Sequence, residues 1–501
     1  MKPVVDIASG RIAGSLEGDV SVFRGIPYGA PTSGDARFRP PSPVAPWAGT
    51  LECVRFGPSS PPTLTPADRD YFPTSALWSV YAGLDERIPF SEDCLRLNVW
   101  TASCEPDARR PVIVWMHGGG FSWGSGSSPL TAGDGLARHH DVVVVTVNHR
   151  LGVLGYLHDP DARAGWADSG IAGLLDLRLA LEWVRDNIAS FGGDPSNVTI
   201  AGHSGGSAKV ACLMALPSAR GLFRRSIIMS GVVTLRSMSV SEATGSTRGL
   251  LEAADLSAKD IDLLRTLPVS RLTALAAGFR FRPVVGEPGL PAHPFDPVAA
   301  ASAAGLDMLV GVAKDDAATF KYDSDPGFAA LGADGLVGRV RGLPGVETDA
   351  RARELVEDFS KRLPNADARH LLVEITTQGL RERTALMLER QLESSQPAVW
   401  NYEFSYDIVM PPDTPFPGEH MAPHGGELPF VFDIADREWL AGDRTDRTEV
   451  AHLVSSYFTN FARTGDPNGR GLAPWPPYSV ASPRVQNLGR ELVGDGPAQP
   501  G

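Results

Sequence analysis

The stretch Val198-Thr-Ile-Ala-Gly-His-Ser-Gly-Gly-Ser207 decides how the rest of the chain is interpreted. A run rich in β-branched residues ends in Gly202-His203-Ser204-Gly205-Gly206, and small residues that suit the start of a helix follow. A Gly-x-Ser-x-Gly pattern between a strand and a helix predicts a nucleophile elbow, a tight turn that exposes the serine at the top of a sheet. The five-residue pattern is also common by chance, so an ordinary structural turn is the alternative at this point.

The composition is that of an ordinary globular protein, with 43% hydrophobic and 21% charged residues among 501. The formal net charge is −13, and no basic stripe is present, which argues against a nucleic-acid partner and favours a small neutral or weakly charged substrate. Four cysteines make no disulfide framework, and no pair of them has metal-ligand spacing. Because no apolar leader or bilayer-length apolar stretch is found, we expect a soluble, cytoplasmic protein.

Segments typical of strands and of helices alternate along the chain. A helix is predicted at 174–189, and a second one directly after Ser204. This alternation predicts an α/β fold, with a mostly parallel sheet and helices on both faces. Gly25 and Pro27 interrupt the segment 20–28, which suits an edge strand or a turn. The predicted strands are 20–28, 95–101, 111–116, 141–148, 198–201, 225–229, 308–312 and 399–404.

Three further segments do not belong to this alternating pattern. Residues 58–81 are rich in Pro, Ser and Thr and are predicted to form a long surface loop. The segments 235–300 and 320–395 are mainly helical in pattern, with no clear strand. We expect both to be insertions over the carboxyl ends of the strands, where α/β sheets bind their ligands.

Three successive glycines at 118–120 follow the predicted strand 111–116. Without side chains, their N–H groups can turn toward one point, as an oxyanion requires. A phosphate-binding loop would need a following Gly-Lys-Ser/Thr, which is missing here. A plain glycine-rich turn is the remaining alternative.

An activated serine also needs a base, and an acid that orients this base. His420 and His424 lie in one Pro/Gly-rich loop, and the residues alone leave both open as the base. Asp315 and Asp316 directly follow the predicted strand 308–312, which places a carboxylate at the same sheet edge as Ser204; a helix cap is the alternative. The order serine, acid, histidine is that of α/β-hydrolases. The other histidines considered are expected to be solvated, packed or architectural: His117, His139, His140, His203, His293, His370 and His452.

These motifs, taken together, resemble the type-B carboxylesterase family, which includes bacterial p-nitrobenzyl esterases, animal carboxylesterases and cholinesterases. The resemblance runs nearly end to end and rests on the elbow and on the stretches 23–28, 91–100, 117–121, 147–152, 191–199, 283–285, 424–429 and 460–468.

The resemblance implies a single α/β-hydrolase domain over 1–501 that hydrolyses small-molecule carboxylic esters through an acyl-enzyme. It implies no cofactor and no metal, and we expect a monomer or small homo-oligomer. It assigns Ser204 as the nucleophile, His424 rather than His420 as the base, and Asp316 as the acid, where the family more often has Glu. Asp315 stays the second choice for the acid. The implied oxyanion donors are the N–H groups of Gly119, Gly120 and Gly205, and Ser230 is the implied support of the acid–base pair.

Besides Asp316, two departures from the family pattern concern His203 and Cys94. His203 stands where Glu is usual, so we expect a weaker preference for cationic, choline-like esters. Cys94 matches half of a disulfide of secreted relatives, but Ser60 stands at its partner's position, so we expect a free thiol. Two alternative functions are a carbamate or aryl-amide hydrolase with the same residues, and a non-catalytic binding protein of the same fold.

Overall fold

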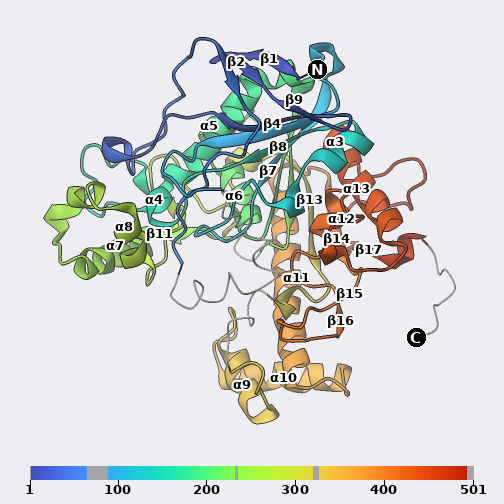
Figure 1. Ribbon diagram of the computed structural model, residues 1–501. Coiled ribbons are helices and arrows are strands. Elements are labelled where there is room, and N and C mark those ends of the chain that lie inside the picture. Colours follow the sequence, from blue (N-terminus) through green and yellow to red (C-terminus); the bar gives the residue numbers. More distant parts are fainter. Residues whose placement is uncertain (1, 65–87, 232–234, 320–326, 494–501) are drawn as a thin grey trace.

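The computed structural model describes residues 2–64, 88–231, 235–319 and 327–493 (Figure 1). Most of the predicted surface loop at 58–81 therefore lies outside the described residues. No helix within the described ranges is both long enough and apolar enough to cross a membrane.

A ten-stranded sheet forms the centre of the described part of the chain, as expected for an α/β fold (Figure 1). The strands from β17 to β8 run parallel, and β6, β4 and β3 complete the sheet in antiparallel pairs. In sheet order they are β17 (Gln486–Leu488), β14 (Val399–Phe404), β13 (Asp307–Ala313), β10 (Arg225–Met229), β9 (Gly193–His203), β7 (Arg110–Met116), β8 (Val143–Val147), β6 (Arg96–Thr101), β4 (Val20–Pro27) and β3 (Ser15–Glu17).

All eight predicted strands are present, with two corrections. β4 is not an edge strand, because β3 pairs along its outer side; the pairing of β4 with β6 shifts register around Gly25, whose N–H donates to Asn98 Oδ1. β9 begins at Gly193 rather than at Val198, because its first residues pair with β7 across a register shift. The sequence pattern missed this extension because Asp194 and Pro195 are typical of turns.

The alternation of side chains along β7 shows how both faces of the sheet are covered. Val112 and Val114 pack into the apolar core on the side of α5 (Ala172–Asn187) and α6 (Gly205–Met214). Ile113 and Trp115 point the other way, into the core shared with α3 (Asp134–His140) and α13 (Arg447–Thr464). Successive side chains of a strand face opposite sides, so a run of apolar residues predicts a strand buried on both.

The two predicted insertions lie apart from each other in Figure 1. The first contains the helices α7 (Val240–Ala253) and α8 (Val269–Ala276), and also a short parallel pair that the sequence did not predict: β11 (Met238–Ser239) with β12 (Val284–Val285). The second contains α9 (Ala333–Arg341), α10 (Asp349–Arg362) and α11 (Ala368–Ser395). α11 packs along β13, and Thr377 Oγ1 accepts a hydrogen bond from the N–H of Ala317.

The remaining elements are short and complete the body. β1 (Val4–Ile7), β2 (Gly10–Ala13) and β5 (Thr50–Glu52) form a small sheet near the N-terminus, and α4 (Gly152–Tyr156) follows β8. β15 (Ile408–Val409) pairs with β16 (His420–Met421), and α12 (Leu428–Val431) follows the loop that carries His424.

Candidate active site

Ser204 lies at the turn between β9 and α6, in a backbone conformation that side-chain-bearing residues rarely adopt. Its φ is 58° and its ψ is −119°, which is a strained combination for a residue other than glycine. The turn is also crowded: a β-carbon on Gly206 would lie 2.0 Å from the carbonyl oxygen of Met116, and one on Gly202 would lie 2.4 Å from the backbone of Gly206. The predicted elbow is therefore present, and Ser204 immediately precedes the positive end of the α6 dipole.

The glycine loop after β7 lies directly against the elbow. Gly119 and Gly120 have φ values of 83° and 59°, in the left-handed region that favours glycine. A β-carbon on Gly205 would lie 2.3 Å from the backbone nitrogen of Gly120. The main chains of the three predicted oxyanion donors therefore converge beside Ser204.

A buried lysine that the sequence analysis did not single out lies beneath this loop. Lys209 is on α6 and fully buried, and its Nζ donates to the carbonyl oxygens of His117 at 2.8 Å and Gly118 at 3.5 Å. Burial lowers the pKa of Lys209 to about 7. The short hydrogen bond holds the His117 carbonyl, and the longer contact places the Lys209 ammonium beside the peptide group that carries the N–H of Gly119, a candidate oxyanion donor.

The imidazole of His117 continues this basic region. Its ring centroid lies 4.9 Å from that of His149, and both side chains are buried. Burial, and then the charge of Lys209, lower the pKa of His117 and of His149 well below the usual range for histidine. Both imidazoles are therefore neutral at pH 7, and Lys209 is the group of this region whose charge changes near that pH.

The structure brings His424 and Asp316 together. His424 Nδ1 lies 2.8 Å from Asp316 Oδ1, and both side chains are buried. The second carboxylate oxygen, Oδ2, accepts hydrogen bonds from Ser230 Oγ at 2.5 Å and from the N–H of Ala313 at 3.0 Å. Each oxygen of Asp316 thus has its own partners, which fixes the plane of the carboxylate and the orientation of the imidazole.

The alternative base, His420, and the alternative acid, Asp315, have other contacts. His420 is half exposed, and its Nδ1 lies 3.0 Å from Asp407 Oδ2. Asp315 Oδ2 accepts the N–H of Ala422 at 2.9 Å, so this carboxylate holds the segment just before His424. Burial raises the pKa of Asp315.

Glu427 is a second buried carboxyl group of this site, and the sequence analysis gave it no role. Its Oε1 lies 3.2 Å from Ser230 Oγ and 3.4 Å from His203 Nε2. Burial, and then the charge of Asp316, raise the pKa of Glu427 to about 8, so its protonated form prevails at pH 7. The signal in the sequence was an acidic residue three positions after His424, inside a buried apolar segment.

His203 is fully buried rather than placed on an open wall of the site. Its ring centroid lies 4.4 Å from that of His424. Burial, and then His424, lower the pKa of His203 well below the usual range. His203 thus lies beside His424 and Glu427, and its predicted effect on choline-like esters stays a prediction.

Comparisons with known proteins identify the family to which the chain belongs. A model of the carboxylesterase family matches residues 1–497. The chain is 32% identical to the para-nitrobenzyl esterase of Bacillus subtilis (strain 168), with 98% of this chain and 95% of that protein covered. It is 31% identical to the phenmedipham hydrolase of Pseudarthrobacter oxydans, with 98% and 96% covered. The crystal structure of the Geobacillus stearothermophilus carboxylesterase EST55 is 33% identical and has a TM-score of 0.80, covering 97% of this chain and 96% of that one.

Proposed function

This chain belongs to the carboxylesterase family and hydrolyses carboxylic esters, and on that premise we propose that Ser204, His424 and Asp316 carry out the reaction. The observation that carries this proposal is the strained turn at Ser204, which lies on the same sheet edge as the His424–Asp316 pair. The parallel order of β7, β9, β10 and β13 supports the proposal, because Ser204, the glycine loop and Asp316 each follow one of these strands at the same edge of the sheet.

In the proposed mechanism, His424 takes the proton of Ser204 while Ser204 Oγ attacks the ester carbonyl carbon. The N–H groups of Gly119, Gly120 and Gly205 bind the oxyanion that forms. His424 then protonates the leaving alcohol, which leaves an acyl-enzyme on Ser204. A water molecule, deprotonated by His424, hydrolyses the acyl-enzyme and restores the serine.

Asp316 and Ser230 act as supports in this mechanism. A carboxylate at His424 Nδ1 keeps the proton on that nitrogen, so that Nε2 is available as the base. It also stabilises the imidazolium that forms during attack. Ser230 and the N–H of Ala313 hold Asp316 in place, so the imidazole needs little reorganisation.

Replacement of the nucleophile tests this proposal. We expect Ser204→Ala to lower kcat on p-nitrophenyl butyrate by about 10⁵ to 10⁶-fold, because no other group can form the acyl-enzyme. Ser218→Ala, at an exposed serine after α6, is the matched control and should keep the wild-type rate. A Ser204→Ala variant that is folded by circular dichroism and hydrolyses the ester at the wild-type rate would refute the assignment.

A carbamate or aryl-amide substrate is the second candidate, and the similarity to a phenmedipham hydrolase favours testing it. The same nucleophile and oxyanion donors serve any acyl group, so the leaving group decides the rate. Values of kcat/KM for an ester, a carbamate and an anilide with matched aryl groups, and for phenmedipham itself, separate the two functions. The ester function predicts the highest value for the ester.

Three further proposals concern the number of domains, the cellular location and the oligomeric state. The match of one family model to residues 1–497 supports a single domain. Cys94 is a free, buried thiol next to Ser60, and the other cysteines are free as well, which supports the cytoplasm as its location. We propose a monomer or small homo-oligomer, which light scattering would establish.

A further inference from the structure

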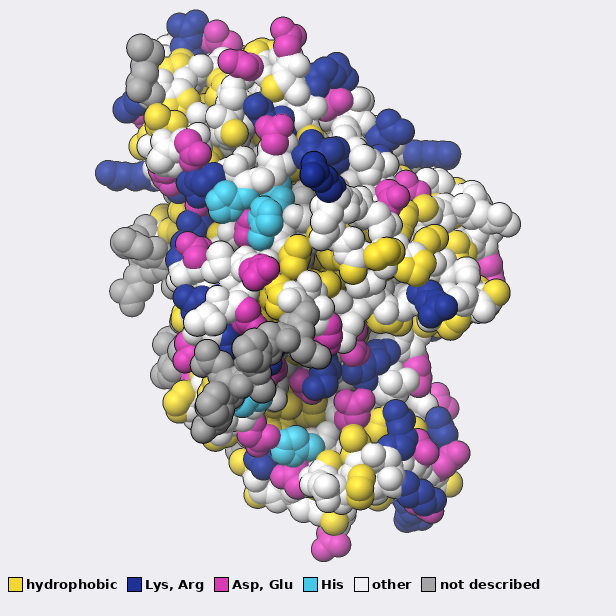
Figure 2. Space-filling view, turned by 90° about the vertical axis from the view of Figure 1, so that its right-hand side faces the viewer, with side chains coloured by type: hydrophobic (Ala, Val, Ile, Leu, Met, Phe, Trp, Pro, Cys, Tyr) yellow, Lys and Arg dark blue, Asp and Glu magenta, His cyan; other side chains and the backbone are white. Residues whose placement is uncertain are grey.

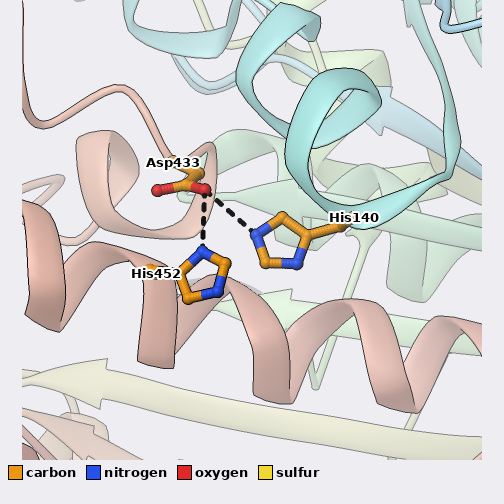
Figure 3. A group of neighbouring side chains, drawn as sticks. All are labelled: His140, Asp433 and His452. Atoms are coloured by element: carbon orange, nitrogen blue, oxygen red, sulfur yellow. Dashed lines mark hydrogen bonds and ion pairs between the residues drawn. The ribbon is translucent and has the colours of Figure 1, made fainter.

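A second group of histidines surrounds a carboxylate at the surface formed by α3 and α13. His140 is the last residue of α3, His452 lies on α13, and Asp433 follows α12. Figure 3 shows both imidazoles turned toward one oxygen of Asp433. Figure 2, which views the side of the molecule that carries α3 and α13, shows histidine side chains gathered at the surface. We call His140, Asp433 and His452 the helix-end cluster.

One carboxylate oxygen of Asp433 lies close to the imidazole nitrogens of this region. Asp433 Oδ2 lies 3.1 Å from His140 Nε2, 3.5 Å from His452 Nδ1 and 2.8 Å from Nδ1 of the neighbouring His139. A carboxylate oxygen offers about two lone-pair sites, so three imidazole nitrogens exceed what it can accept. An imidazole nitrogen that does not donate to this oxygen presents a lone pair, and a cation can bind that lone pair and the carboxylate oxygen together.

We propose that the helix-end cluster binds a divalent transition-metal ion, with zinc as the ion that suits it. Zinc binds imidazole nitrogen and carboxylate oxygen, and three protein ligands leave the fourth tetrahedral position to water. The edge of a tetrahedron with zinc–ligand bonds of about 2.0–2.1 Å is about 3.4 Å long. The two Asp433–histidine distances are close to this edge, and the three ligand atoms lie within 4.8 Å of one another.

The surroundings of the cluster meet the other needs of a metal site. The side chains of His140 and Asp433 are only 6% and 5% exposed, whereas that of His452 is 57% exposed. The site is therefore fixed on its inner side and open to solvent on its outer side. His139 remains a hydrogen-bond partner of the carboxylate, in the role that outer residues have around bound metals.

Two adjustments accompany binding. His140 Nε2 gives up its contact with Ser455 Oγ, which keeps hydrogen bonds to the carbonyls of Ala451 and His452. Both imidazoles present a deprotonated nitrogen to the metal, so their remaining proton moves to the far ring nitrogen. A metal bound here links three segments, one of which follows the loop of His424.

Metal binding to the full chain tests this proposal. After treatment with a chelator and its removal, the protein is titrated with zinc chloride at pH 7.5 by calorimetry, and with cobalt(II) by absorption. We expect one saturable zinc site and the intense visible bands of tetrahedral cobalt. His452→Ala replaces a surface ligand, and we expect it to weaken zinc binding at least tenfold and to remove the cobalt bands. Its melting temperature in chelator checks that it is folded.

His370→Ala is the matched control, because His370 also contacts two carboxylates, Asp367 and Glu419, at another surface. It should keep the zinc site. The proposal is overturned if zinc shows no saturable binding, if His452→Ala binds zinc as the wild type does, or if His370→Ala is the variant that loses the site. In each of these cases the helix-end cluster is a hydrogen-bonded network without a metal.

Discussion

The proposed active site and the helix-end cluster are both built from histidines around an aspartate, yet they differ in how the carboxylate is shared. Asp316 gives one oxygen to His424 and the other to Ser230 and the N–H of Ala313. Asp433 instead has three imidazole nitrogens around a single oxygen. The first arrangement satisfies every partner and orients one ring, whereas the second leaves more nitrogens than the oxygen can serve.

The two regions also differ in how deeply their side chains are buried. The side chains of His424 and Asp316 are completely enclosed, while His452 is largely open to solvent. An enclosed pair is protected from competing water and suits proton transfer. A half-open group with a rigid inner side suits the entry of an ion. Similar residue types therefore support different chemistry because of their partners and their exposure.

The contrast between the two carboxylates would fail most clearly if Asp316 were not needed for ester hydrolysis. We expect Asp316→Asn to lower kcat about 10⁴-fold, because an amide at this place favours the wrong tautomer of His424. Asp407→Asn is the control, because Asp407 pairs with the half-exposed His420 and should tolerate the change. Hydrolysis of p-nitrophenyl butyrate measures both; a near-normal rate for Asp316→Asn contradicts the account.

A second test concerns the source of positive charge in the two regions. In the proposed active site this charge comes from Lys209, whereas the proposed metal ion would supply it at the helix-end cluster. Since Lys209 contacts the Gly118–Gly119 peptide group rather than the substrate's oxyanion itself, we expect Lys209→Met to lower kcat about tenfold, less than the loss of a direct oxyanion donor.

The effect of Lys209 should depend on pH. Burial lowers its pKa to about 7, so the ammonium form exists below pH 7 and is lost above it. The ratio of wild-type to Lys209→Met kcat should therefore be largest in acid and fall as the pH rises through 7. Using a ratio removes any pH dependence that both proteins share. A ratio independent of pH would contradict a role for the charge.

The smallest expected effect on rate comes from Glu427, which contrasts with Asp433 in its protonation. Burial opposes ionisation of both, but the hydrogen bonds with His140 and His139 lower the pKa of Asp433, whereas that of Glu427 is raised to about 8. Glutamine resembles the protonated form, so Glu427→Gln should change kcat at pH 7 by no more than about twofold, as expected when no charge is removed.

The melting temperature of Glu427→Gln reports the protonation of Glu427 more clearly than the rate does. A carboxyl group whose pKa is raised by folding stabilises the protein at low pH and loses this contribution as the pH rises toward 8. The wild-type melting temperature should therefore fall relative to that of Glu427→Gln between about pH 5 and pH 8. A constant difference over this range would show that Glu427 is ionised throughout.

The fold was largely predictable because its signals are local. Apolar runs such as 143–147 are strands of a doubly covered sheet, and the glycines around Ser204 permit the tight turn that the pattern predicts. The elbow, the glycine loop and the strand-end aspartates each follow a recognisable strand. The choice of His424 over His420 came only from the resemblance, because both lie in the same loop and only tertiary structure distinguishes them.

The residues that the sequence analysis missed depend on contacts between distant segments. Lys209 lies within a helix that is buried on every side, so its charge has to find a partner, but its sequence does not show that the partner is the glycine loop. His140 and His452 were expected to be merely packed or solvated. They meet only because α3 and α13 pack on the same face of the sheet.

The central claim, that Ser204 is the nucleophile, is tested most directly by covalent labelling. The full chain is treated with a fluorophosphonate, and the modified peptide is identified by mass spectrometry. The account predicts one adduct, on Ser204, formed in proportion to the loss of esterase activity and formed far more slowly in His424→Ala. An adduct on another serine, or full loss of activity without an adduct on Ser204, would contradict it.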